Sequence, residues 1–88
     1  MSYQLVRLPR ATRQLSQLRR LHHPLYNAIV DAIKALAETP RPPGCVKLAG
    51  RPEWRIRVRD HRILYSVDDV LQVVTITEIG HRREIYRQ

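Results

Sequence analysis

The chain has few of the features that stabilise a protein covalently or place it in a membrane. Its 88 residues include one cysteine, Cys45, so no disulfide can form within the chain, and this fits a reducing cytoplasm. The uninterrupted apolar runs are too short to span a bilayer, and no charged, then apolar, then small-residue leader opens the sequence. We expect a soluble cytoplasmic protein that does not associate with membranes.

Acidic residues are also scarce, and none of them forms a recognisable catalytic or metal-binding pattern. The chain has 8 Asp and Glu residues against 16 Lys and Arg residues. No carboxylate pair points to glycosidase or metal chemistry. The histidines lack metal-ligand spacing, with each other or with Cys45; they are His22, His23, His61 and His81. The sequence predicts no metal site and no cofactor.

Positive charge is what the chain has in excess. The formal net charge is +8, which implies an acidic partner such as nucleic acid, an anionic membrane or an acidic protein. The charge is densest between residues 41 and 62, which hold seven cations and two anions. Five arginines are expected to face solvent or a protein partner: Arg7, Arg13, Arg19, Arg20 and Arg41.

The centre of this basic segment alternates large apolar residues with arginines. Successive side chains of a strand point to opposite faces, so the alternation predicts a strand over residues 54–59 with an apolar and a cationic face. The apolar face would carry Trp54, Ile56 and Val58, and the cationic face Arg55, Arg57 and Arg59. Guanidinium groups about 7 Å apart along one strand repel each other. Such a row is therefore expected to hold a polyanion.

The segments before residue 40 predict one strand and two helices. Residues 3–8 read as a strand closed by Pro9. An apolar stripe at helical spacing follows, made of Ala11, Leu15, Leu18 and Leu21. Residues 22–24 break this helix, and a second helix is expected to begin at Pro24 and to end at Thr39.

The segments after residue 40 predict strands. A proline-rich connection spans residues 40–44. A short strand is expected at 46–48, two strands at 54–59 and 62–67 around a turn at Asp60-His61, and a long central strand at 70–79. The order is β-α-α-β-β-β-β. We therefore predict one α+β domain over residues 1–88, with both helices on one face of a small sheet in which antiparallel pairs dominate.

Several short segments together form a family-like pattern. They are Lys47-Leu48, Gly50, Trp54-Arg55-Ile56-Arg57-Val58, Arg62-Ile63-Leu64-Tyr65, Ile79-Gly80-His81-Arg82 and Tyr86. With this spacing the chain resembles the RelE/ParE superfamily of type II toxin–antitoxin toxins over nearly its whole length. The RelE-like branch of that resemblance implies a toxin that enters the ribosomal A site and cleaves mRNA, and a small acidic antitoxin encoded beside it.

The resemblance also implies residue roles in a metal-free reaction, in which the ribose 2′-hydroxyl attacks the adjacent phosphate and leaves a 2′,3′-cyclic phosphate. Arg55 and Arg57 match positions that contact the RNA backbone and help to remove the 2′ proton. Arg62 and Arg82 match positions that stabilise the phosphorane and assist the leaving group, and Tyr86 matches a tyrosine that stacks on the scissile nucleotide. Further RNA contacts are expected from Lys47 and Arg59.

Two kinds of residue are candidates for the general base. Arginine carries protons poorly because a guanidinium pKa lies above about 12, so Arg55 and Arg57 are weaker bases than lysines would be. His81, and after it His61, are the alternatives, because imidazole titrates near neutral pH.

Two rival functions stay open at this point. The gyrase-poisoning branch of the same superfamily shares the fold and has no nuclease site; Arg62 and the segment from Arg82 to Tyr86 favour cleavage over it. The other rival is a non-catalytic basic module that binds RNA or DNA through phosphate contacts alone.

Overall fold

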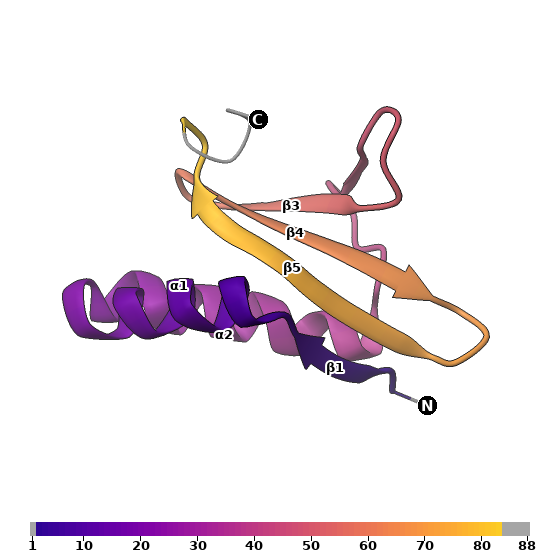
Figure 1. The fold of residues 1–88 in the computed structure, drawn as a ribbon, viewed down its shortest axis with the longest axis horizontal. Coiled ribbons are helices and arrows are strands. Elements are labelled where there is room, and N and C mark those ends of the chain that lie inside the picture. Colours follow the sequence, from indigo (N-terminus) through magenta and orange to yellow (C-terminus); the bar gives the residue numbers. More distant parts are fainter. Residues whose placement is uncertain (1, 84–88) are drawn as a thin grey trace.

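The computed structural model describes residues 2–83 and contains, within them, two helices and five strands (Figure 1). In chain order these elements are β1 (Gln4–Arg7), α1 (Pro9–Leu21), α2 (His23–Glu38), β2 (Val46–Lys47), β3 (Trp54–Val58), β4 (His61–Asp68) and β5 (Val73–His81). The order β-α-α-β-β-β-β and the α+β class agree with the sequence-based prediction.

The strands form one mixed sheet in the order β1-β5-β4-β3-β2. Adjacent strands are antiparallel, except that β1 runs parallel to β5. The longest strand, β5, lies between β1 and β4, which explains why both of its faces are rich in apolar and β-branched residues. It begins at Val73 and not at the predicted Val70, because residues 70–72 form the turn that follows β4.

The helix boundaries follow from local chemistry. Pro9 is the first residue of α1. α2 begins at His23, one residue earlier than predicted, so Pro24 is its second residue. Proline is tolerated there because the first backbone amides of a helix have no intrahelical acceptor. At the junction, His22 Nδ1 accepts a hydrogen bond from the Leu25 amide at 3.3 Å. Within the described residues, neither helix has the length and apolar character needed to cross a membrane.

Both helices pack on the same face of the sheet (Figure 1). The core between them is built by helix residues Ala11, Leu15, Leu25, Ile29, Ile33 and Leu36 and by strand residues Ile56, Ile63, Tyr65, Val74, Ile76 and Ile79. Their burial supplies the main stabilisation, at roughly 25 cal/mol per Å² of apolar surface. Within residues 2–83, no helix lies over the opposite face of the sheet.

The hairpin between β3 and β4 is one residue out of phase with its prediction. β3 ends at Val58, which pairs with His61, so the turn is Arg59-Asp60 and not Asp60-His61. Arg59 has a φ of 54°, which is left-handed backbone and not strand. The expectation that Arg59 continues the row of Arg55 and Arg57 is therefore wrong: its Cα lies in the turn.

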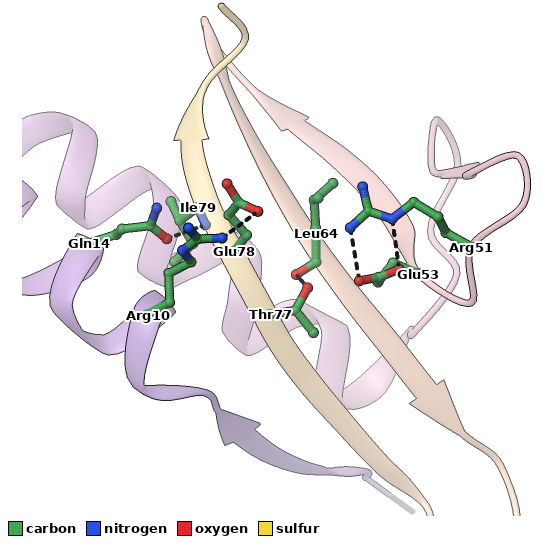
Figure 2. A network of polar contacts seen from close by, with 8 residues as sticks. All are labelled: Arg10, Gln14, Arg51, Glu53, Leu64, Thr77, Glu78 and Ile79. Atoms are coloured by element: carbon green, nitrogen blue, oxygen red, sulfur yellow. Dashed lines mark hydrogen bonds and ion pairs between the residues drawn. The ribbon is translucent and has the colours of Figure 1, made fainter. Parts of the chain in front are cut away.

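A bulge in β5 sets which of its residues face the core. Leu64 pairs with Glu78 whereas Tyr65 pairs with Ile76, so Thr77 is an extra residue. The Thr77 hydroxyl donates a hydrogen bond to the Leu64 carbonyl at 3.1 Å (Figure 2). Because of this bulge, Ile76 and Ile79 both enter the core, and Glu78 lies on the opposite face.

Candidate functional site

Three of the predicted arginines share the helix-free face of the sheet. Directly paired residues of neighbouring strands project on the same side, and the register forms two rows across β3, β4 and β5. These rows are Arg55, Leu64, Glu78 and Arg57, Arg62, Gly80. We call the surface around Arg55, Arg57 and Arg62 the arginine face. The sequence did not show on which face of the sheet Arg62 lies. The two-residue turn places it opposite Arg57, on the same face.

The three arginines differ in burial. Arg57 is exposed and Arg55 is half-buried, whereas Arg62 is only 7% exposed. Arg62 Nε has no hydrogen-bond partner, and no carboxylate among residues 2–83 forms an ion pair with Arg62. Burying a charge without a counterion is unfavourable. A guanidinium held in this way is preorganised for an incoming anion, which would supply the missing acceptors.

Two carboxylates of this part of the sheet, Glu53 and Glu78, are each held by an arginine outside the arginine face (Figure 2). Glu53 accepts hydrogen bonds from Arg51 Nε at 3.2 Å and Arg51 Nη2 at 3.1 Å, so both of its oxygens are engaged. Glu78 is held through one oxygen, with Arg10 Nη1 of α1 at 3.5 Å from Oε1. The sequence analysis missed Glu78. The uneven spacing of Val74, Ile76 and Ile79 was the available signal, since it departs from period two and marks the bulge.

α1 also fixes the position of this part of β5. β1 pairs with β5 only as far as Ile76, and beyond that point Gln14 Oε1 of α1 accepts a hydrogen bond from the Ile79 amide at 2.7 Å (Figure 2). The helix thus satisfies and covers the edge of the strand that carries Glu78 and Gly80.

His61 and His81 lie away from the arginine face. They are opposite each other on β4 and β5, with ring centroids 5.6 Å apart and planes at 82°. Both line a hollow together with Gln17 and Leu21 of α1, on the helix side of the sheet. His81 Nδ1 accepts the Arg83 amide at 3.1 Å. The structure therefore does not bring either predicted alternative base to Arg57 and Arg62.

The other predicted site residues are distributed around the sheet. Lys47 is opposite Trp54 and so projects to the side away from Arg55, and its ammonium donates to the Arg51 carbonyl. Arg82 follows β5 and is exposed, and its amide donates to the Asp60 carbonyl at 2.9 Å. This bond places Arg82 next to the Arg59-Asp60 turn. Tyr86 lies outside the described residues.

Arg41 is exposed, as expected, and it also makes contacts that the sequence did not predict. Its guanidinium donates to both oxygens of Asp69, at 3.2 and 2.8 Å, and lies 5.2 Å from the centre of the Trp54 ring. The Tyr3 hydroxyl donates to the same carboxylate at 2.8 Å. These bonds hold the pKa of Asp69 below its usual value, first because of Arg41 and second because of Tyr3. Arg41 therefore ties the proline-rich connection to the β4–β5 turn.

No group of three or more His, Cys, Asp or Glu side chains within residues 2–83 is arranged to hold a metal ion. The chemistry available on the arginine face is that of guanidinium donors and one partly engaged carboxylate.

Comparison with known proteins identifies the family. Residues 5–86 match the family described as the ParE toxin of the type II toxin-antitoxin system parDE. The chain belongs to this family. It is a toxin of the RelE/ParE superfamily of type II toxin–antitoxin systems, as its motifs suggested. A search of curated proteins finds no significant match to the toxin.

Solved structures show the same fold. A double mutant of the E. coli toxin RelE in the free state is 27% identical, with 92% of the toxin and 84% of that chain covered and a TM-score of 0.73. The archaeal RelE–RelB complex from Pyrococcus horikoshii is 23% identical, covering 96% and 99%, with a TM-score of 0.79. A YoeB/ParE toxin from Agrobacterium tumefaciens is 21% identical, covering 90% and 98%, with a TM-score of 0.80.

Proposed function

We propose that the toxin is a ribosome-dependent mRNA endoribonuclease that blocks translation, with its active site on the arginine face. The observation that carries this proposal is Arg62, which is 7% exposed without a carboxylate partner among the described residues, opposite Arg57. Such an arrangement weakens a fold unless an anion completes it. An RNA phosphodiester, presented in the ribosomal A site, is the anion that the resemblance to RelE-like toxins supplies.

In the proposed reaction the ribose 2′-oxygen attacks the neighbouring phosphorus, and the bond to the 5′-oxygen breaks. Negative charge collects on the non-bridging oxygens, where Arg57 and Arg62 donate hydrogen bonds. Each well-placed donor is worth about 3–4 kcal/mol of transition-state stabilisation. Arg55 contacts the RNA backbone, and Arg82 and Tyr86 keep the roles that the resemblance implies. The 5′-oxygen takes a proton from water and leaves as a hydroxyl, and the base returns the 2′ proton to solvent, so the step consumes no net proton.

The proton released by the 2′-hydroxyl needs an acceptor on the same face. His61 and His81 project to the helix side of the sheet. Glu78 lies on the arginine face, and among residues 2–83 its Oε2 has no ion-pair partner. A carboxylate accepts a proton far more readily than a guanidinium does. Glu78 is therefore the proposed general base.

A cognate antitoxin is the proposed protein partner. The net charge of +8 suits a small acidic chain encoded beside the toxin, which could fold as it binds. The solved E. coli RelBE structure is a toxin–antitoxin complex, and the P. horikoshii structure is a RelE–RelB complex.

The deciding experiment is cleavage on programmed ribosomes. Purified toxin is added to ribosomes stalled with a defined codon in the A site, and cuts are mapped by primer extension. Wild type and an Arg20→Gln control, altered on the exposed surface of α1, should cut the mRNA, and Arg62→Gln should not. Intact mRNA with the wild-type toxin would refute the proposal.

A gyrase inhibitor is the second candidate, favoured by the match to the ParE family. A DNA-supercoiling assay with purified gyrase separates the two: loss of supercoiling or linear DNA, with intact mRNA on the ribosome, would establish the second. A non-catalytic nucleic-acid-binding module would give neither result, and its binding would weaken steeply with salt.

A further inference from the structure

Gly80 is the β5 member of the row that contains Arg57 and Arg62 on the arginine face. It lies on β5 directly opposite Arg62, which is itself opposite Arg57, so one row across three strands reads arginine, arginine, glycine. A glycine inside a strand weakens the strand, because it has high conformational entropy when unfolded and no side chain to pack. Its presence in this row therefore needs a reason.

The two common structural reasons do not apply to Gly80. The glycines with positive φ in the described chain are Gly44 and Gly50, so the backbone at Gly80 is one that any residue can adopt. A Cβ atom built at Gly80 would have no other heavy atom of the described residues within 4 Å. Neither backbone conformation nor close packing in the folded protein requires glycine at this position.

The neighbouring row shows what a filled position looks like. Two residues earlier on β5, Glu78 projects on the same face, opposite Leu64. There Leu64 is 0% exposed. In the row of Arg62, the β5 position contributes no side chain, and no heavy atom of the described neighbours lies within 4 Å of the place where a Cβ would stand.

We infer that Gly80 is the floor of a phosphate-binding seat, and that its missing side chain lets a phosphodiester reach the buried guanidinium of Arg62. A phosphate has oxygens on every side, so two of them can accept from Arg62 and Arg57 while the group rests over the β5 backbone. A ligand that approaches backbone closely is a known reason for glycine in a strand. Gly80 thus acts as a positioning residue through the space it leaves. The assignment of the phosphate to mRNA rests on the proposed function; the seat itself does not.

The test is a size series at position 80 with a matched control on the same strand. Gly80→Ala adds one methyl group and Gly80→Val fills the seat. The control is Thr75→Val, at a β5 position on the same face, paired with Ser66 and away from the arginines. Each purified variant is measured for thermal unfolding, for binding of a short RNA whose scissile ribose is 2′-deoxy, and for cleavage on programmed ribosomes.

Valine favours strands and glycine does not, so Gly80→Val should unfold at the same temperature as wild type or higher. Its affinity for the uncleavable RNA should fall by about tenfold and its cleavage by about 100-fold, as expected when the reacting group is displaced by about 1 Å. Gly80→Ala should lie between wild type and Gly80→Val. Thr75→Val should bind and cleave as wild type does.

Two outcomes would overturn the seat. In one, Gly80→Val binds and cleaves normally while Arg62→Gln is inactive, which leaves the nuclease proposal standing. In the other, Gly80→Ala and Gly80→Val lower Tm and RNA affinity together, which would show that the glycine is needed for the fold. If wild type does not cut mRNA, yet Gly80→Val and Arg62→Gln both lose RNA affinity, the seat stands and the proposed function falls.

Discussion

Arg57 and Arg62 lie directly opposite each other on neighbouring antiparallel strands, on the sheet face opposite α1 and α2. Like charges in opposing positions destabilise a sheet by a few tenths to about 1 kcal/mol, and the burial of Arg62 adds a desolvation penalty. A protein that keeps such a pair accepts lower stability at this point. The pair therefore lowers the stability of the fold, and we attribute its presence to anion binding.

Replacing Arg62 by methionine should reveal this conflict. Arg62→Met keeps an unbranched side chain of similar length and removes the buried charge, so the free energy of unfolding should rise by about 1 kcal/mol. For a domain of this size that raises Tm by about 4–8 °C. Cleavage should fall by about 10²- to 10³-fold. A variant that loses both stability and activity would show that Arg62 supports the fold.

Replacing Glu78 by glutamine should separate chemistry from binding. An amide cannot accept the 2′ proton, so Glu78→Gln should lower the cleavage rate by about 10²- to 10⁴-fold while the uncleavable RNA still binds. The matched control is Arg10→Gln, which removes the ion pair with Glu78 and keeps the carboxylate. If Arg10→Gln shows the same loss, Glu78 only anchors α1 to β5 and is not the base.

Much of the fold follows from local sequence patterns, and the deviations have physical causes. The stripe from Ala11 to Leu21 and the break before Pro24 locate both helices, because helical periodicity and proline chemistry act over a few residues. The phase of the Arg59-Asp60 turn does not follow from pattern alone, because a two-residue turn can begin at either of two adjacent positions with similar local energy. That one-residue shift removes Arg59 from the row.

The site was predictable in part for the same reason. Alternation alone places Arg55 and Arg57 on one face. Arg62 joins them only through strand register, which depends on the turn, and Glu78 only through the bulge. The partnership of Arg41 with Asp69 joins residues far apart in the chain, which no short pattern can predict. The sequence contains Gly80, but the role inferred for it depends on the strand register and on the space that the described residues leave around its Cα.

The dependence of RNA affinity on salt concentration should report how many phosphates the arginine face contacts. Each phosphate neutralised on a single strand contributes about 0.7 to the slope of log affinity against log salt. Arg57 is exposed and belongs to the row of Arg62, so Arg57→Gln should reduce the slope for the uncleavable RNA by about that amount. Arg20→Gln, on α1, should leave the slope unchanged. Equal slopes for Arg57→Gln and wild type would place the RNA elsewhere.

Tyr65 should matter for stability and not for cleavage. Its ring is buried in the core, and its hydroxyl donates to the Pro40 carbonyl at 2.7 Å. Burial raises the pKa of Tyr65, so the hydroxyl stays protonated and continues to donate. Tyr65→Phe should lower the free energy of unfolding by about 1–2 kcal/mol, measured by urea denaturation. At urea concentrations below the unfolding midpoint of the variant, it should cleave RNA at the wild-type rate, because Tyr65 faces the helices.

The contact between Arg41 and Asp69 should make stability depend on pH in the acid range. The pKa of Asp69 is lower in the folded protein than in the unfolded chain, because Arg41 and then Tyr3 donate to the carboxylate. Its contribution is therefore fully present above the unfolded value of about 3.9 and is lost as pH falls through the lower folded value. Asp69→Asn removes this contribution at every pH.

The measurement is thermal unfolding of wild type and Asp69→Asn between pH 7 and pH 2, at low salt because exposed pairs are screened. The difference in Tm between the two proteins should be constant from pH 7 to about pH 5 and should shrink below about pH 4. Asp68→Asn is the control from the same turn. Asp68 forms no ion pair within the part of the chain that the structure describes, so the variant keeps the contact between Arg41 and Asp69 and should still lose stability in the acid range. A difference between Asp69→Asn and wild type that does not change with pH would mean that the carboxylate at position 69 titrates alike in both states.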